Sequence, residues 1–158
     1  SMKIAIYPGS FDPITLGHLD IIKRAAACFD KVYVCVMANC AKNPMFDADK
    51  RMELVRASVR DIENVEVEAH SGLLASYARN KGATVLVKGV RNGTDFDIEY
   101  QQALINKGIC EELETVLLPA SAPYVHFSST MVREMIRYGQ PLEKYVPAPV
   151  AEELKERK

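Results

Sequence analysis

Residues 3–18 of the 158-residue chain read KIAIYPGSFDPITLGH, and this stretch decides the fold that we expect around it. Its first half alternates apolar and β-branched residues, which is typical of a buried strand, and Pro8-Gly9 marks the end of that strand. From about Gly17 apolar residues recur at three- and four-residue spacing, which is the period of an amphipathic helix. The stretch therefore predicts a strand, a short loop and the start of a helix.

A strand that leads into a helix through such a loop forms an anion-binding site. The free backbone N–H groups of the helix start and the positive end of its dipole both point at the loop. His18 lies in the first turn of the expected helix and adds a hydrogen-bond donor there. Although a single histidine more often has a structural role, this position favours a functional one. Ser10 can donate its hydroxyl to a phosphate, Phe11 can supply an apolar contact, and we expect Asp12 to order its own turn.

The length and composition indicate one globular domain. A chain of 158 residues, with 48% hydrophobic and 26% charged residues, can bury one sizeable core but hardly two. We expect a single domain over residues 2–158, with Ser1 left from a cleaved expression tag. The net charge of −1 creates no general attraction to nucleic acid or to anionic lipid, so any phosphate binding must be local.

The sequence also argues against membrane insertion, zinc and disulfides. The longest apolar run, residues 32–38, is far shorter than a membrane span, and no leader peptide is recognisable, so we expect a cytoplasmic protein. The cysteines at positions 28, 35, 40 and 110 have no C-x-x-C spacing, and neither a zinc site nor a disulfide framework is expected.

Strand and helix patterns alternate along the rest of the chain. Further strands are predicted at 31–37, 65–69, 85–87 and 115–118, with residues 88–93 as the exit loop of the fourth. Helices are predicted after an Asp47 cap, at 73–81 up to Gly82, at about 95–108, and after Ser128 up to Gly139. The polar tail from Glu152 predicts a short surface helix. This order predicts an α/β fold: a single-domain, Rossmann-like, doubly wound, five-stranded parallel sheet.

Each cluster of polar or basic residues directly follows a predicted strand, and ligands of such sheets bind at the carboxyl ends of the strands. Lys42 follows the second strand, in a loop that Pro44 stiffens. Lys88 and Arg91 straddle Gly89, which allows a polyphosphate to approach the backbone closely. Residues 128–130 are three hydroxyl residues at a helix start, with Arg133 one turn further on, which is typical of a second anion site as well as of an N-cap.

Several of these blocks resemble a known family. Gly9-Ser10-Phe11-Asp12-Pro13 and Thr15-Leu16-Gly17-His18 resemble the signature of nucleotidyltransferases. Residues 39–42 with Pro44 and Phe46, residues 88–91, and residues 124–130 with Arg133 extend the match in the same order. The chain as a whole resembles the bacterial phosphopantetheine adenylyltransferases.

The resemblance implies a role for each matching residue. His18 would stabilise the charge that develops on the α-phosphate of ATP during transfer. The implied ATP-binding residues are Ser10, Phe11, His18, Gly89, Val90, Arg91, Glu99, Tyr124, Val125, His126, Phe127, Ser128, Ser129 and Thr130. The implied phosphopantetheine-binding residues are Ser10, Lys42, Leu74 and Lys88. Glu99 rests on the family alone, because an acidic residue on a helix usually faces solvent. Position 88 is usually arginine in the family, and Lys88 lacks the two-pronged guanidinium.

The implied reaction transfers the adenylyl group of ATP to 4′-phosphopantetheine and yields dephospho-coenzyme A and pyrophosphate, a step of coenzyme A biosynthesis. A phosphate nucleophile is already ionised at neutral pH, so positioning and charge stabilisation suffice for catalysis. The family also implies Mg²⁺ carried by ATP, a homohexamer, and coenzyme A as a feedback ligand. The sequence offers no carboxylate cage for a metal.

Two alternatives stay open at this point. The chain could be another small nucleotidyltransferase, acting on nicotinamide mononucleotide or a polyol phosphate. It could also be a regulatory module that binds a nucleotide without turnover, which His18, Arg91 and residues 128–130 argue against.

Overall fold

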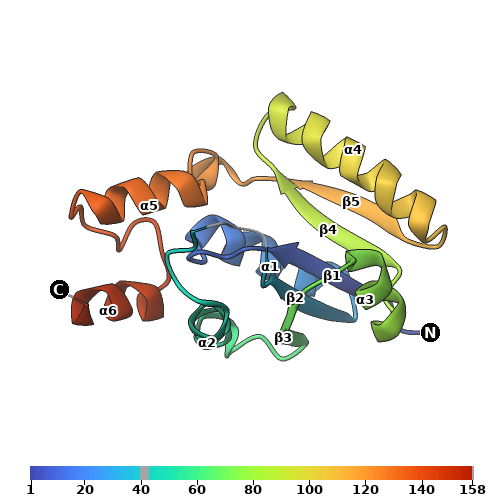
Figure 1. Ribbon diagram of the computed structural model, residues 1–158, viewed down its shortest axis with the longest axis horizontal. Helices are drawn as coiled ribbons and strands as arrows, with labels where there is room; N and C mark the ends of the chain where they lie inside the picture. Colours follow the sequence, from blue (N-terminus) through green and yellow to red (C-terminus); the bar gives the residue numbers. More distant parts are fainter. Residues whose placement is uncertain (40–42, 158) are drawn as a thin grey trace.

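The computed structural model describes residues 1–39 and 43–157, and a parallel sheet of five strands forms its centre (Figure 1). The strand order is β3-β2-β1-β4-β5, so the chain starts in the middle of the sheet and builds outward in both directions. The predicted α/β fold with a doubly wound parallel sheet is confirmed. The strands are β1 (Ile4–Gly9), β2 (Lys31–Met37), β3 (Val65–His70), β4 (Val85–Val90) and β5 (Glu114–Pro119).

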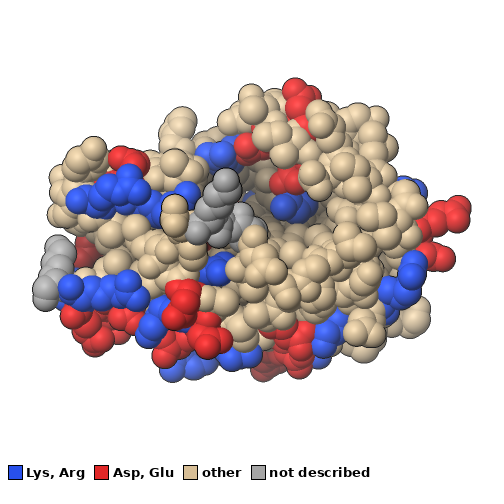
Figure 2. Space-filling model, in the orientation of Figure 1, with Lys and Arg blue, Asp and Glu red and all other residues tan. Residues whose placement is uncertain are grey.

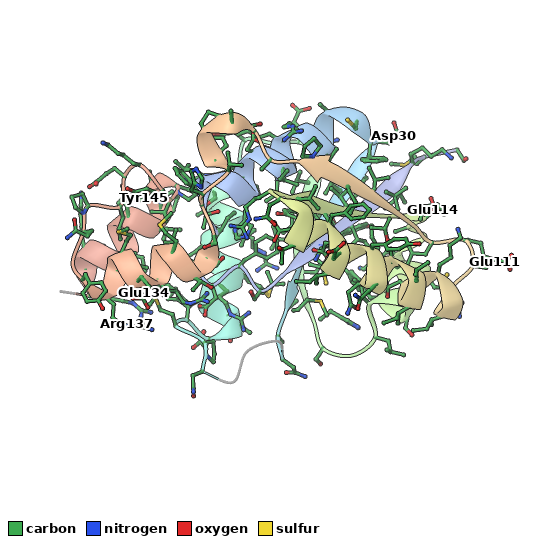
Figure 3. The ribbon with its side chains drawn as sticks, turned by 90° about the horizontal axis from the view of Figure 1, so that it is seen from above. Asp30, Glu111, Glu114, Glu134, Arg137 and Tyr145 are labelled. Carbon is green, nitrogen blue, oxygen red and sulfur yellow. The ribbon has the colours of Figure 1, made fainter. Side chains whose placement is uncertain are left out.

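Helices cover both faces of the sheet. One face packs against α1 (Leu16–Cys28) and α2 (Ala48–Val59), and the other against α3 (Leu74–Lys81) and α4 (Gly93–Ile109). A 3₁₀ helix (Ala122–Tyr124) follows β5 and precedes α5 (Ser129–Arg137) and α6 (Ala148–Glu156). Figure 3 shows Glu134 and Arg137, an ion pair on α5, at one end of the molecule and Glu111 and Glu114 at the other.

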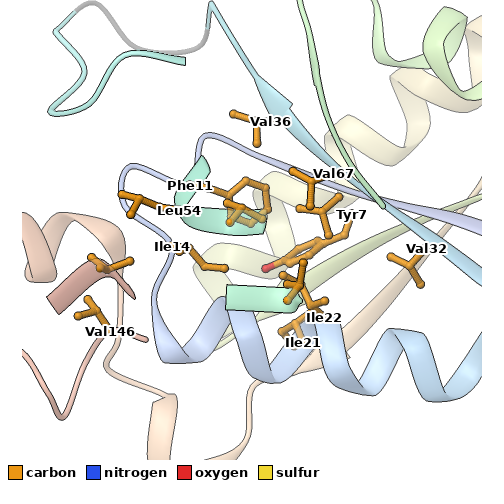
Figure 4. Packing of buried hydrophobic residues seen from close by; sticks show 14 of the residues in the cluster. Tyr7, Phe11, Ile14, Ile21, Ile22, Val32, Val36, Leu54, Val67 and Val146 are labelled. Carbon is orange, nitrogen blue, oxygen red and sulfur yellow. The ribbon is translucent and has the colours of Figure 1, made fainter. Parts of the chain in front are cut away.

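The core is divided between the two faces because side chains of a strand alternate in direction. Ala5 and Tyr7 of β1 join the larger cluster with α1 and α2, whereas Ile6 between them joins the smaller cluster under α3. In the larger cluster, Tyr7 and Phe11 pack close to Ile21 and Ile22 of α1 (Figure 4). The loop after β1 is thus anchored in the core by its own aromatic ring.

Two predictions about elements were wrong. Strand β4 extends three residues beyond Val87, because Lys88, Gly89 and Val90 pair with residues 117–119 of β5. Lys88 and Gly89 therefore lie within the sheet and not in its exit loop. The last helix begins at Ala148, four residues before Glu152, and buries residues 150, 151 and 154. Pro149 does not prevent this start, since the first turn of a helix needs no N–H donors.

The helix ends follow the local sequence. Asp47 accepts a backbone hydrogen bond as the predicted N-cap of α2, and of the predicted cap cluster at residues 128–130 it is Ser128 that caps α5. Gly82 ends α3 in the left-handed conformation, with φ of 67°. None of the helices in the described part of the chain has both the length and the apolar character needed to cross a bilayer.

The left-handed end of α3 gives a stability prediction. Gly82→Ala should lower the free energy of unfolding by about 1–2 kcal/mol, because a Cβ is strained at this φ. The added methyl group would meet no atom within 4 Å, so the strain is in the backbone alone. Gly82→Asn is the control, since asparagine tolerates the left-handed region, and it should lose less stability. Urea unfolding measures both variants, and equal losses would contradict the assignment.

Candidate functional site

Thr15 and His18 hold each other at the start of α1. The hydroxyl of Thr15 accepts from the backbone N–H of His18 at 3.1 Å, and Nδ1 of His18 accepts from the backbone N–H of Thr15 at 3.0 Å. This reciprocal pair is a capping box in which histidine replaces the usual glutamate or glutamine. Because Nδ1 accepts a hydrogen bond, the proton of the neutral ring is on Nε2. The helix start thus fixes both the tautomer and the direction of the imidazole.

The surroundings of His18 keep its ring neutral. Burial lowers the pKa of His18 from its ordinary 6.5 to about 4, and the positive charges of Lys88 and Arg91 act in the same direction. The ring of Phe11 meets that of His18 edge to face, with 5.0 Å between the centroids. At neutral pH the site therefore offers an uncharged N–H donor at Nε2, with the charges of Lys88 and Arg91 near enough to act on the ring.

A cavity of about 370 Å³ opens beside His18. It collects residues from four places that are distant in sequence: β1 with its loop and α1, the end of β4 with the start of α4, the loop after β5, and the start of α5. The face drawn in Figure 2 is hollowed near its centre, and basic and acidic side chains meet in the hollow. Predicted residues that line the cavity are Ser10, Phe11, His18, Lys88, Gly89, Arg91, Glu99, Tyr124, Phe127, Ser128 and Ser129.

Lys88 of β4 and Arg91, the residue after this strand, are each paired with a carboxylate of α4. Nζ of Lys88 lies 3.2 Å from Oε2 of Glu99, and these side chains are only 27% and 17% exposed. Nε and Nη2 of Arg91 donate to the two oxygens of Asp95 at 3.0 and 3.3 Å, and the backbone N–H of Arg91 donates to Asp95 as well. Lys88 therefore faces the cavity and not solvent, and Glu99 is not on a solvated helix face.

A smaller cavity of about 80 Å³ adjoins the first and shares Pro8, Lys88 and Glu99 with it. Leu74, at the first turn of α3, lines this second cavity together with Leu86 of β4. The Lys88–Glu99 pair thus stands between a larger, polar space and a narrow extension that reaches the smaller core. Leu74 lies on this extension and not in the main cavity.

The hydroxyl residues before and in α5 have different surroundings. Ser128 is the N-cap, accepting from the backbone N–H of Met131 at 3.0 Å, and it lines the cavity with Ser129. Thr130 instead accepts from Arg133, whose other guanidinium nitrogen donates to the backbone oxygen of Asp12 at 3.0 Å. Arg133 therefore ties α5 to the loop after β1.

The remaining predicted site residues either line neither cavity or lie outside the described part of the chain. Val90, Val125, His126 and Thr130 are not among the described residues that line either cavity. Lys42 lies outside the described residues, so its predicted role stays a prediction.

The sequence interpretation missed Tyr7, Asp95 and Ile21, which line the cavity. Asp95 had a signal, because it follows Arg91 by four residues, the spacing of a helical ion pair. Tyr7 had no such signal in the sequence, since it lies within the alternating pattern of an ordinary strand. Burial, followed by the charge of Glu99, raises the pKa of Tyr7 above its ordinary value.

The prediction for Asp12 was wrong. Its carboxylate is buried and accepts from the backbone N–H groups of Met45 at 2.7 Å and Phe46 at 2.9 Å. Asp12 therefore does not order its own turn but connects the loop after β1 to the segment before α2. The partners lie 33 and 34 residues away, and local sequence carries no sign of such a contact.

The environment of His18 predicts its titration. We expect the ring to take up a proton near pH 4, measured by the pH dependence of its C2–H resonance, which His18→Gln identifies by removing it. Since the folded pKa lies below the ordinary 6.5, the unfolded chain binds this proton more tightly. The contribution of the neutral His18 to the free energy of unfolding is therefore fully present above pH 6.5, and it is lost as the pH falls toward 4. A midpoint above pH 6 would contradict the burial and the two cationic neighbours.

Comparison with known proteins shows which families this chain resembles. A family model described as cytidylyltransferase-like matches residues 6–135. The phosphopantetheine adenylyltransferase of Caldanaerobacter subterraneus is 47% identical over 156 residues, which are 99% of this chain and 98% of that protein. The same enzyme of Synechococcus sp. strain JA-3-3Ab is 48% identical over 154 residues, 98% of this chain and 97% of that protein.

A solved structure shares the fold at lower identity. A bifunctional NMN adenylyltransferase/ADP ribose pyrophosphatase from Francisella tularensis matches with a TM-score of 0.77 and 15% identity, over 99% of this chain and 49% of that one. At this identity the match concerns the fold alone. The full-length relatives decide the family: the chain belongs to the phosphopantetheine adenylyltransferases, within the cytidylyltransferase-like nucleotidyltransferases.

Proposed function

We propose that the protein transfers the adenylyl group of ATP to 4′-phosphopantetheine, yielding dephospho-coenzyme A and pyrophosphate in coenzyme A biosynthesis. The observation that carries the proposal is the neutral His18 ring, directed by Thr15 into a cavity that also holds Lys88 and Arg91. An uncharged donor and two cations around one cavity suit a reaction in which phosphate groups meet and negative charge builds up. The membership of the family supplies the two substrates.

The chemical step is a displacement at the α-phosphorus. An oxygen of the 4′-phosphate forms a bond to the α-phosphorus. At the same time the bond between the α-phosphorus and the oxygen that bridges it to the β-phosphate breaks, and pyrophosphate leaves with that electron pair. The nucleophile is an anion, so no side chain has to remove a proton. His18 donates its Nε2 proton in a hydrogen bond to a non-bridging α-phosphate oxygen. That bond strengthens as charge develops, which lowers the barrier.

The two cavities suggest a division between the substrates. The larger cavity takes ATP, with Arg91 on its phosphates and the hydroxyls of Ser128 and Ser129 at the start of α5 on the β- and γ-phosphates. The narrow extension with Leu74 takes the pantetheine arm, and Lys88 at its entrance meets the 4′-phosphate. Lys42 would bind the same phosphate from the loop after β2.

A magnesium ion fits this site as a companion of ATP. The two cavity carboxylates, of Asp95 and Glu99, are already paired with cations, and the described residues contain no cluster of three metal-ligating side chains. Mg²⁺ would therefore be held by phosphate oxygens and water, with a serine hydroxyl of the α5 start nearby. Bound there, it would neutralise part of the phosphate charge.

The assembly and regulation of the family extend the proposal. Helix α4 has no buried residue, and its large apolar side chains are 45–57% exposed: Phe96, Ile98, Tyr100, Leu104, Ile105 and Ile109. Exposed apolar side chains of this kind suit contacts between copies of the chain, in line with a homohexamer. Coenzyme A, which carries the same pantetheine arm, would compete for the extension as a feedback ligand. The supply of ATP makes the cytoplasm the proposed location.

The reaction and the role of His18 are tested together. Wild-type protein should release pyrophosphate only when ATP and phosphopantetheine are both present. His18→Ala should lower kcat by about 100- to 1,000-fold, the usual effect of removing one such donor. Thermal unfolding checks that the variant is folded. Pyrophosphate release with nicotinamide mononucleotide instead of phosphopantetheine, or a loss in kcat below tenfold, would contradict the proposal.

Lys88 is tested by its effect on one substrate. Lys88→Ala should raise the KM for phosphopantetheine by a factor that corresponds to about 1–3 kcal/mol, the value of a hydrogen bond to a charged group. Lys88→Arg should keep full activity or bind the substrate slightly more tightly. The control is Lys107→Ala, which removes another lysine–glutamate pair, with Glu114, whose two residues line neither of the two cavities. Unchanged kinetics of Lys88→Ala would remove Lys88 from the site.

A further inference from the structure

Arg51 of α2 is a buried cation that the proposed reaction does not use. Its side chain is only 2% exposed and heads the fully buried side chains of the molecule by volume. Within the described ranges its guanidinium donates to backbone carbonyls: Nε to Phe46 at 3.1 Å, Nη1 to Ser10 at 2.8 Å and to Met37 at 3.2 Å, and Nη2 to Ala38 at 3.3 Å. One side chain thus joins three separate segments of backbone.

These segments meet where two neighbouring strands diverge. The paired residues of β1 and β2 end at Gly9 and Val36. Ser10 is the next residue of one strand, and Met37 and Ala38 continue the other. The guanidinium lies at the fork and supplies hydrogen bonds where the strand pairing stops. From there one branch leads to Phe11 and His18, and the other toward Lys42 in the sequence.

A second buried charged residue, Asp12, also links the loop after β1 to the segment before α2. Both backbone groups of Phe46 are hydrogen-bonded to buried charged residues. The N–H of Phe46 donates to Asp12 of the β1 loop, and the carbonyl of Phe46 accepts from Arg51. Asp12 is also 2% exposed. The end of the segment after β2 is therefore fastened to the β1 loop directly, through Asp12, and indirectly, through Arg51 and Ser10.

Stability alone does not call for a cation at this position. An apolar side chain could fill the same volume without the cost of taking a charge out of water. What a guanidinium adds is a planar set of donors with fixed directions, which sets the distance between the carbonyls that it binds. At this fork, that distance is the separation of the two loops.

We propose that Arg51 is a positioning residue for adenylyl transfer: it sets the separation between Ser10 after β1 and the described ends of the segment after β2, at residues 37–38 and 46. This rests on the proposed function, in which the first loop leads to His18 and the second carries Lys42. The separation of the loops then determines how far the 4′-phosphate stands from the α-phosphorus. Small displacements at that distance cost much of the rate.

Arg51→Lys is the direct test, because lysine keeps the charge but loses the planar fork. The matched control is Arg56→Lys on the same helix, where the guanidinium makes one hydrogen bond, at 3.2 Å, to the carbonyl of Val67 in the edge strand β3. We expect kcat to fall about 10- to 100-fold in Arg51→Lys and to change less than about twofold in the control. The dissociation constant of ATP should stay within about threefold of the wild-type value, because Arg91, Ser128 and Ser129, proposed to bind the phosphates, are not among the hydrogen-bond partners of Arg51.

A readout apart from turnover separates this proposal from the proposed function. Hydrogen exchange at the amides of Met45 and Phe46 should be faster in Arg51→Lys than in wild type, and unchanged in Arg56→Lys. Wild-type protein without pyrophosphate release would contradict the proposed function, while the exchange rates still decide whether Arg51 holds the loops. Asp12→Asn is the second variant. The N–H groups of Met45 and Phe46 bond to different oxygens of Asp12, and asparagine replaces one of these acceptors with an NH2 donor, so the same amides should exchange faster and kcat should fall.

Three outcomes would contradict the positioning role of Arg51. A folded Arg51→Lys protein with kcat within threefold of wild type, or with wild-type exchange at Met45 and Phe46, would reduce Arg51 to a part of the core. So would a loss of activity that only matches a lower folded fraction, as measured by thermal unfolding of both lysine variants. Faster exchange with normal turnover would also exclude the positioning role.

Discussion

The site depends on two reciprocal hydrogen bonds between Thr15 and His18. A helix start has N–H groups without partners inside the helix, and the capping box satisfies two of them with two side chains. Because one of these side chains is an imidazole, the same bonds that begin α1 also choose the tautomer and direct Nε2 into the cavity. Local folding and proposed catalysis therefore use the same pair of contacts, and a change in either residue affects both.

The charges around His18 are balanced before any ligand binds. Lys88 is paired with Glu99 and Arg91 with Asp95, so the cations are held at the cavity wall by the helix that follows their strand. These partly exposed pairs contribute little to stability by themselves. In the proposed reaction their value lies in placement, because phosphate groups that enter the cavity would meet cations that are already oriented. The same cations, together with burial, keep His18 uncharged.

The sequence predicted much of the framework. Apolar and β-branched patterns located every strand, and the position of polar blocks after strands predicted one rim, where the structure does bring Ser10, His18, Lys88 and Arg91 together. The extent of β4 escaped prediction because a Lys-Gly pair reads locally as a loop, while pairing with β5 continues the strand. The roles of Asp12 and Arg51 escaped for a similar reason, since each joins backbone groups more than thirty residues away.

In the proposed reaction the neutral imidazole of His18 meets the α-phosphate of ATP in the cavity at the strand ends. A crystal structure with phosphopantetheine and a non-reactive ATP analogue tests it most directly. The account predicts an α-phosphate oxygen within hydrogen-bond distance of Nε2, with Nδ1 still accepting from the backbone N–H of Thr15. An α-phosphate bound elsewhere, or a ring turned so that Nε2 faces Thr15, would contradict it.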